Sequence, residues 1–259
     1  MSGLAVVTGA SSGIGREYGR RLASNGVHLI AIGRRRERLD ELAGEFPGVS
    51  VQTVVADLAT QDGIDAVVEA IANQPVTMLV NNAGVAHYKP FVDLSPEQAQ
   101  ELVGVKVLAP TLLTREVAPG MVERAAGQIV NVSGMIAFSG PASLEQFPLR
   151  RAVYAASLAH SVAFSQALHA ELSPHGIQVQ ALCPGVVATE FHERQGMDLS
   201  AVPRMTAADV VTASLRGLEL GETVTAPGVE QAGLLQSVFD AEMAAFTGQS
   251  PQLATRYRS

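Results

Sequence analysis

The chain alternates short apolar runs with longer segments of helical periodicity over most of its length. The apolar runs are rich in valine and isoleucine and are hydrophobic on both faces, which is typical of parallel strands covered by helices. Strands that alternate with helices form βαβ units, and successive units build a doubly wound parallel sheet. The sequence therefore predicts an α/β fold of about seven strands, at Leu4–Thr8, Val27–Ile32, Val49–Ala56, Met78–Val80, Gln128–Val132, Ile177–Leu182 and Thr223–Thr225.

The segments between these runs predict helices and a single domain. Apolar residues recur at helical spacing in 14–24, 36–46, 64–72 and 99–123. No repeat or low-complexity tract divides the 259 residues, so we expect one domain over 1–259. The segments 135–151 and 190–205 are irregular and follow strand ends, where such sheets bind ligands. The polar segment 247–259 is expected to be a flexible tail.

Composition argues against several classes of function. The net charge is −7 and the pI about 5.4, and the richest basic run, 34–36, is too short for a nucleic-acid surface. The single cysteine, Cys183, can form neither an internal disulfide nor a metal cage. No apolar run reaches the roughly 18 residues of a membrane span. We therefore expect a cytoplasmic protein with no metal, nucleic-acid or membrane partner.

A glycine-rich turn, Thr8-Gly9-Ala10-Ser11-Ser12-Gly13-Ile14-Gly15, joins the first predicted strand to the first predicted helix. Gly9 permits the tight turn, Gly13 lets the backbone approach a pyrophosphate, and Gly15 lets the helix pack closely on the sheet. The helix N-terminus offers free N–H groups and a positive dipole end to phosphates. The predicted dinucleotide site at this turn comprises Gly9, Ser11, Ser12, Gly13, Ile14 and Gly15.

This turn is one of several motifs that resemble those of the short-chain dehydrogenase/reductase family, whose members have a Rossmann-type fold. The spacing Gly-x-x-x-Gly-x-Gly resembles the family fingerprint, and Asn81-Asn82-Ala83-Gly84 after the fourth strand is similar to a specific family motif. Other segments resemble the family's adenine-binding turn and the segment that holds the nicotinamide carboxamide. The resemblance covers roughly residues 3–230. It implies cofactor contacts at Asp57, Leu58, Asn82, Ala83, Gly84, Pro184, Gly185, Val187 and Thr189.

The end of the second strand indicates which dinucleotide is bound. A 2′-hydroxyl requires an acidic acceptor at this place, whereas a 2′-phosphate requires a cation. The strand ends in Ile32-Gly33-Arg34-Arg35-Arg36, with no acidic residue before Glu37. Cations at a helix N-terminus oppose its dipole, so a bound phosphate explains them better than a solvated helix start does. We expect NADP(H), with Arg34 as the main contact.

The resemblance also implies four catalytic positions, of which only the tyrosine is kept. Tyr154 stands where the family uses a tyrosine for proton transfer. The lysine position four residues later is Leu158, the serine position is Gly134, and the asparagine position on the long helix is Lys106. Gly134 and Tyr154 are 20 residues apart, more than is usual in the family.

Lys106 and His87 are the candidates to compensate for these losses. Lys106 has apolar neighbours, and the resemblance puts it beside the missing lysine, where its ammonium could approach Tyr154; the alternative is a lysine with no catalytic role. His87 could donate a proton near neutral pH or serve as an ordinary polar loop residue. Ser139 and Ser143 could replace the missing hydroxyl or simply form turns.

These substitutions favour reduction over oxidation. A tyrosine with an ordinary pKa of about 10 is only about one part in a thousand ionised at pH 7, so it is a poor base but is protonated as an acid. The loss of the polarising hydroxyl can cost a further factor of about 10² to 10³. We expect an NADPH-dependent carbonyl reductase with a mainly apolar substrate, because phenylalanines occur in 85–92, 134–151 and 186–205.

Two other functions stay open: a non-redox enzyme such as a cyclase, dehydratase or isomerase, and a catalytically silent NADP(H)-binding protein. The fold by itself does not choose among the three. The resemblance further implies that 190–205 covers the substrate and that the chain forms a homodimer or homotetramer.

Overall fold

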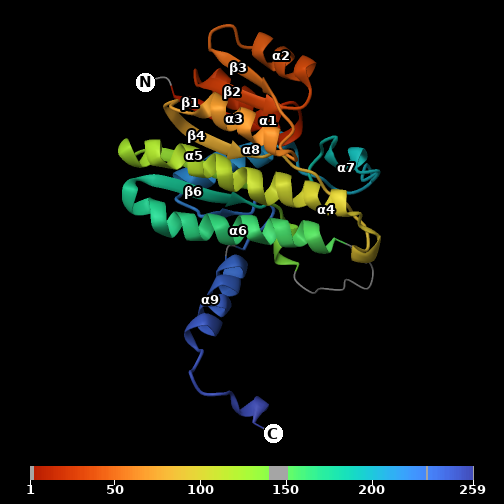
Figure 1. Cartoon of the computed structure of the whole chain (residues 1–259), viewed down its shortest axis with the longest axis vertical. Helices are drawn as coiled ribbons and strands as arrows, with labels where there is room; N and C mark the ends of the chain where they lie inside the picture. Colours follow the sequence, from red (N-terminus) through yellow and green to blue (C-terminus); the bar gives the residue numbers. More distant parts are fainter. Residues whose placement is uncertain (1–2, 140–150, 232, 259) are drawn as a thin grey trace. The chain divides into compact units, whose positions relative to one another are not determined.

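The computed structural model describes residues 3–139, 151–231 and 233–258. Internal contacts divide the chain into two units, 1–227 and 228–259. The elements of the first unit, of which Figure 1 labels α1–α8, β1–β4 and β6, are β1 (Leu4–Thr8), α1 (Gly13–Ser24), β2 (His28–Gly33), α2 (Arg36–Gly44), β3 (Val51–Val55), α3 (Gln61–Ile71), β4 (Val76–Asn81), η1 (Phe91–Asp93), α4 (Pro96–Val103), η2 (Gly104–Leu108), α5 (Ala109–Glu123), β5 (Gly127–Val132), η3 (Met135–Phe138), α6 (Ala152–Leu172), η4 (Ser173–His175), β6 (Ile177–Leu182), α7 (Phe191–Arg194), α8 (Ala207–Glu219) and β7 (Val224–Thr225). The second unit contains α9 (Gly233–Thr247) and the short 3₁₀ turn η5 (Thr255–Tyr257).

The first unit is built on one sheet of seven strands in the order β3-β2-β1-β4-β5-β6-β7. Every neighbouring pair of strands is parallel. The order reverses between β1 and β4, because the chain winds outward from β1 through β2 to β3 and then continues from β4 on the other side. The predicted doubly wound parallel sheet is therefore confirmed, and its switch point lies where β1 meets β4.

Helices cover the two faces of this sheet and form two apolar cores. In β1, Val6 faces the core shared with α3, α5 and α6, whereas Val7 faces the core shared with α1, α2 and α8. Successive strand residues point to opposite faces, so strands buried on both sides must be apolar throughout. Figure 1 shows α4, α5 and α6 together on one face of the sheet.

Capping residues determine where several helices begin. Thr60 accepts a hydrogen bond from the Gly63 N–H at the start of α3, and Thr206 accepts one from the Asp209 N–H at the start of α8. Ser95 and Gln98 form a capping box at α4. Each side chain satisfies an N–H that the first turn of a helix leaves free.

The predicted helix 99–123 is interrupted, and this difference bears on the site. The segment is split into α4, the π-helical turn η2 and α5. Pro110 at the start of α5 has no N–H to donate to the Lys106 carbonyl, and its ring crowds that carbonyl, so a regular α-turn is disfavoured there. The wider turn carries Lys106, and such π-turns often occur at functional sites.

Within the described part of the chain, no helix combines the length and apolar character required to cross a bilayer.

Candidate cofactor and active site

A cavity of about 740 Å³ opens at the carboxyl ends of the strands, around the switch point. Open α/β sheets bind their ligands at this place. The elements that line it are the glycine-rich turn, the ends of β2, β4, β5 and β6, the turns η2 and η3, the start of α6, and the segment from 184 to 202. Among the predicted site residues, the cavity is lined by Gly9, Ser11, Ser12, Gly13, Ile14, Arg34, Asp57, Leu58, Asn82, Ala83, Gly84, His87, Lys106, Tyr154, Pro184, Gly185, Val187 and Thr189.

The glycine-rich turn has the shape that a pyrophosphate requires. Gly9 and Gly13 have positive φ angles of 68° and 53°, a conformation that glycine adopts without strain. A Cβ on Gly15 would lie 2.4 Å from the Gly9 carbonyl oxygen, so only glycine permits this approach of α1 to the turn. The Ser12 side chain does not cap α1, which leaves the first N–H groups of the helix for a phosphate.

Asn82 holds the glycine-rich turn against the end of β4. Its side-chain amide donates to the Thr8 carbonyl over 2.9 Å. The backbone N–H groups of Asn82 and Ala83 both donate to the Thr8 hydroxyl, each over 2.9 Å. The Asn-Asn-Ala-Gly motif is therefore hydrogen-bonded to Thr8 at the end of β1, and it holds the ends of β1 and β4 together beside the cavity. The sequence pattern did not reveal this role.

Two arginines provide positive charge where β2 ends. Arg34 lies 3.8 Å from both Asp57 and Glu101 and is half-exposed. Arg35 forms an ion pair of 2.6 Å with Glu190 and donates to the Ser11 hydroxyl over 3.3 Å. The sequence prediction emphasised Arg34, whereas Arg35 lies nearer the glycine-rich turn.

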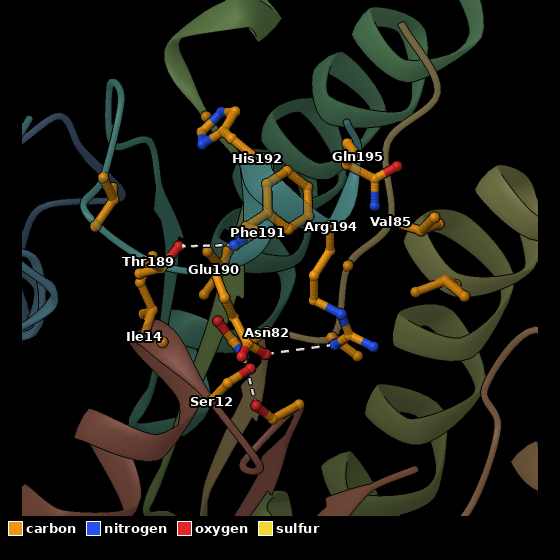
Figure 2. A pocket seen from close by; sticks show the side chains of 18 of the residues that line it. Ser12, Ile14, Asn82, Val85, Thr189, Glu190, Phe191, His192, Arg194 and Gln195 are labelled. Carbon is orange, nitrogen blue, oxygen red and sulfur yellow. Dashed lines mark hydrogen bonds and ion pairs between the residues drawn. The ribbon is translucent and has the colours of Figure 1, made fainter. Parts of the chain in front are cut away.

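The segment from 184 to 194 forms another wall of the cavity. A parallel bridge pairs Val187 with Met205, and the Thr189 hydroxyl accepts a hydrogen bond from the Phe191 N–H over 3.3 Å. Figure 2 shows this contact, together with the ion pair of 3.4 Å between Glu190 and Arg194. The Arg35 guanidinium holds the pKa of Glu190 below its usual range. Glu190, at the start of α7, is therefore joined by an ion pair to Arg35, which follows the end of β2.

Tyr154 lies near the start of α6, only 7% exposed, and its ring meets the Tyr88 ring edge-on with centroids 5.6 Å apart. Burial, and then the neighbouring Tyr88, raise the pKa of Tyr154 well above 10. The hydroxyl therefore stays protonated at neutral pH. It is suited to donate a proton and poorly suited to accept one.

Lys106 is 6% exposed on η2, which packs against α6. Its ammonium donates to the Val132 carbonyl over 3.5 Å, and burial lowers the pKa of Lys106 to about 8. A Cβ on Gly84 would lie 2.7 Å from the Lys106 Nζ, so Gly84 also provides room for this side chain. Lys106 and Tyr154 share one cavity, but within the described residues no hydrogen bond or ion pair joins them.

At the positions where the resemblance implies a catalytic lysine and serine, the structure has Leu158 and Gly134. Leu158 is buried, and its Cδ1 lies 3.5 Å from the place where a Gly134 Cβ would be. The Ser133 hydroxyl donates to the Leu158 carbonyl over 2.9 Å, and the Ser139 hydroxyl donates to the Ile136 carbonyl over 2.7 Å. Both are therefore engaged by the backbone. Ser143, the other candidate hydroxyl, lies outside the described residues.

His87 lines the cavity and faces α4. Its Nε2 lies 2.8 Å from the Glu101 carboxylate, which also approaches Arg34. His87 is thus held by a carboxylate of α4. In the described part of the chain, no group of three histidine, cysteine or acidic side chains is arranged to hold a metal ion.

Comparison with known proteins places this geometry in a family context. The family model described as short chain dehydrogenase matches residues 3–199. Over 195 residues the chain is 36% identical to the very-long-chain 3-oxoacyl-CoA reductase of Anas platyrhynchos, an alignment that covers 72% of this chain and 60% of that protein. Over 193 residues it is 37% identical to the human inactive hydroxysteroid dehydrogenase-like protein 1, covering 72% of this chain and 56% of that protein.

Solved structures resemble more of the chain. A short-chain dehydrogenase from Sphingobium yanoikuyae in complex with NADPH matches with a TM-score of 0.92 at 33% identity, covering 98% of this chain and all of that one. The bulky-bulky ketone specific alcohol dehydrogenase of Comamonas testosteroni matches with a TM-score of 0.87 at 29% identity, covering 98% of each chain.

Proposed function

Because the chain belongs to the short-chain dehydrogenase family, we propose that it reduces the carbonyl group of a small to medium apolar substrate with NADPH. The observation that carries this proposal is that one cavity contains both the cofactor motifs and Tyr154. The glycine-rich turn, the Asn-Asn-Ala-Gly motif and the segment 184–189 would hold the dinucleotide. Bound NADPH supplies a hydride to a carbonyl carbon.

Two cations support the choice of NADPH over NADH. Arg34 and Arg35 line the cavity at the end of β2, where a 2′-phosphate would lie. The related Sphingobium structure is described as an NADPH complex. Arg35 is held by Glu190 and Ser11, so we propose that a phosphate competes with Glu190 for this guanidinium.

Tyr154 is the proton donor of the proposed reaction. Its hydroxyl would give a proton to the carbonyl oxygen as the hydride reaches the carbon, which leaves a phenolate. The raised pKa makes that phenolate costly, so positive charge in the cavity should assist the step. We propose that Lys106 contributes this charge, because it is the lysine that lines the cavity within the described residues. His87, held by Glu101, would act on the reaction only indirectly.

Apolar side chains next to Tyr154 support an apolar substrate. Val85, Ile136 and Phe191 line the cavity, and Tyr88 packs against Tyr154. The similar alcohol dehydrogenase of Comamonas testosteroni, which is specific for bulky-bulky ketones, suggests ketones with a large group on each side of the carbonyl, and the apolar lining favours apolar groups.

We further propose that residues 1–259 form a single NADP(H)-binding domain, in which 190–205 covers the substrate and 247–259 is a flexible tail. We propose that this protein is cytoplasmic and forms a homodimer or homotetramer. Sedimentation of the full chain tests the oligomeric state.

A catalytically silent NADP(H)-binding protein is the second candidate. It is favoured by Leu158 and Gly134 at the positions where the family resemblance implies the catalytic lysine and serine, because neither side chain can polarise a carbonyl or hold a charge. One similar human protein is itself described as inactive. In this case the cofactor would bind without turnover.

The test uses NADPH that carries deuterium at the transferred position and a panel of apolar aryl ketones. Deuterium on the carbinol carbon of the product would support the reductase, and Tyr154→Phe should then lower kcat by about 10² to 10⁴. Tyr88→Phe, which removes a hydroxyl from the same cavity, should cause a much smaller loss. Product without deuterium would indicate a non-redox enzyme. Tight NADPH binding without turnover of any ketone would favour the silent protein.

A further inference from the structure

Among the residues that the structure describes, no carboxylate pairs with the Lys106 amine in the cavity. Three carboxylates line the described part of the cavity, and each is engaged by another cation. Asp57 and Glu101 each pair with Arg34 at 3.8 Å, and Glu101 also lies 2.8 Å from the His87 Nε2. Glu190 pairs with Arg35 at 2.6 Å. Lys106 is left with the Val132 carbonyl at 3.5 Å, which is a long hydrogen bond.

This environment favours the neutral form of the amine. An ammonium buried without a counter-ion loses its hydration and gains little in return. Apolar side chains complete the surroundings, since Val85, Val105 and Leu158 line the same cavity. The pKa of about 8 agrees with this geometry and leaves about a tenth of the amine neutral at pH 7, against less than about a thousandth for an exposed lysine. A neutral amine has a free lone pair and is nucleophilic.

We propose that Lys106 is a nucleophile that captures aldehydes and ketones with apolar bodies as a Schiff base. The nitrogen lone pair attacks the carbonyl carbon and forms a C–N bond, and one proton of that nitrogen passes to the carbonyl oxygen to give a hydroxyl. Tyr154, in the same cavity, donates a proton to the resulting hydroxyl, and the C–O bond breaks to release water. The nitrogen then returns a proton to the tyrosine and the C=N bond forms. One amine and one carbonyl give one imine and one water, so no oxidant or reductant is consumed.

This inference goes beyond the proposed reduction and does not depend on it. Reduction uses Lys106 as a cation and needs the dinucleotide, whereas capture uses the neutral amine and needs only the cavity. A carbonyl compound held in this way would be a reversible covalent ligand of the site. An experiment can therefore refute one of these two roles of Lys106 without refuting the other.

The sequence makes the test simple because the chain has only two lysines, Lys89 and Lys106. Lys89 is exposed and serves as an internal reference. The full-length protein is treated at pH 7 with benzaldehyde and sodium cyanoborohydride, which reduces an imine to a stable amine. The two lysines are then followed by peptide mass mapping. We expect Lys106 to be modified at least about tenfold faster than Lys89, because a far larger share of its amine is neutral.

Controls separate the cavity from general lysine reactivity. In urea, where the fold is lost, both lysines should react at the same rate. Lys89→Arg should leave the modification of Lys106 unchanged, and Tyr154→Phe should slow it by removing the proton donor for water release. The proposal is overturned if Lys106 in the folded wild-type protein reacts no faster than Lys89. This comparison needs no substitution, so it does not depend on whether a Lys106 variant folds.

Discussion

At the scale of single residues, Lys106 makes the stability of the protein depend on pH. Its folded pKa of about 8 lies below the ordinary value of 10.5, so the unfolded chain binds more protons between these values. The contribution of Lys106 to stability should therefore rise with pH across this window, and the cost of burying its charge is greatest below pH 8. For wild type, we expect about 1 kcal/mol of this cost to be relieved between pH 7 and pH 9.

Lys106→Met keeps most of the side-chain volume but does not titrate. The unfolding free energies of wild type and this variant are measured in urea at pH 7 and at pH 9. Between these two pH values, wild type should gain that ~1 kcal/mol relative to the variant. Burial raises the pKa of Cys183 to about 12, which affects both proteins equally and cancels in the difference. A difference that does not change with pH would mean that the Lys106 amine is not desolvated.

Arg34 and Arg35 are expected to select NADPH over NADH. Removal of either guanidinium deletes a charge-assisted contact to the 2′-phosphate, worth roughly 1.5 to 3 kcal/mol. Arg34→Ala and Arg35→Ala should each raise the calorimetric Kd for NADPH by at least about tenfold and leave that for NADH nearly unchanged. Arg36→Ala is the matched control, because Arg36 is exposed and does not line the cavity. Equal losses for both dinucleotides would contradict the 2′-phosphate assignment.

Residue-level roles could be predicted from sequence only where a motif fixes the backbone. The glycine-rich turn was predictable because its positive φ angles at Gly9 and Gly13 demand glycine. Which of three consecutive arginines approaches Ser11 was not, because that depends on Glu190, far away in the chain. Gly84 similarly matched a cofactor motif, but its closeness to the Lys106 Nζ arises from packing between distant segments.

At the scale of elements, a buried chain of hydrogen bonds joins β5 to α6, the helix that carries Tyr154. The Asn131 side chain in β5 donates to the Ser165 hydroxyl in α6 over 2.9 Å, and it accepts from Asn81 over the same distance. Ser165 is fully buried. Ser165→Ala would leave a buried amide without its acceptor and should cost about 1 to 3 kcal/mol of unfolding free energy.

Ser161 on the same helix provides the matched control. Its hydroxyl donates only to the Ser157 carbonyl of α6, over 3.2 Å, so Ser161→Ala breaks no link between elements. Urea unfolding should show a clearly smaller loss for Ser161→Ala than for Ser165→Ala. Equal losses would mean that this chain of hydrogen bonds does not join α6 to the sheet.

Regular elements were predictable from periodicity, but the interruption of the long helix was not. The apolar pattern continues through 99–123, since the side chains on both sides of η2 still face the core. Pro110 lacks the N–H that a regular α-turn would use at this place, and a hydrophobic pattern does not record such a missing hydrogen bond. Periodicity therefore located the helix that carries Lys106 without giving the direction of its side chain.

At the scale of the whole molecule, the doubly wound parallel sheet was predictable because each strand was apolar on both faces. Helices can cover both faces of a parallel sheet only when the connections cross over it, and this requirement leaves few topologies. Which side chains pair with each other in the cavity was harder to predict. The contacts Arg35–Glu190 and His87–Glu101 join segments that are not neighbours in sequence, and the sequence pattern does not show that these side chains meet.

Cofactor binding should stabilise the folded chain in proportion to its affinity. The proposed site draws on β1, β2, β4 and β6 together, so NADPH should bind the folded state and not the unfolded one. At a concentration of 100 times Kd, such a ligand adds about 2.7 kcal/mol to the free energy of unfolding. For a chain of this size, that gain corresponds to a rise in Tm of roughly 5 to 10 °C. NADH at the same concentration should give a clearly smaller shift, and Arg35→Ala should bring the two shifts together. Equal shifts for wild type with both dinucleotides would refute selection by the arginines, and no shift with either would mean that the glycine-rich turn no longer binds a dinucleotide.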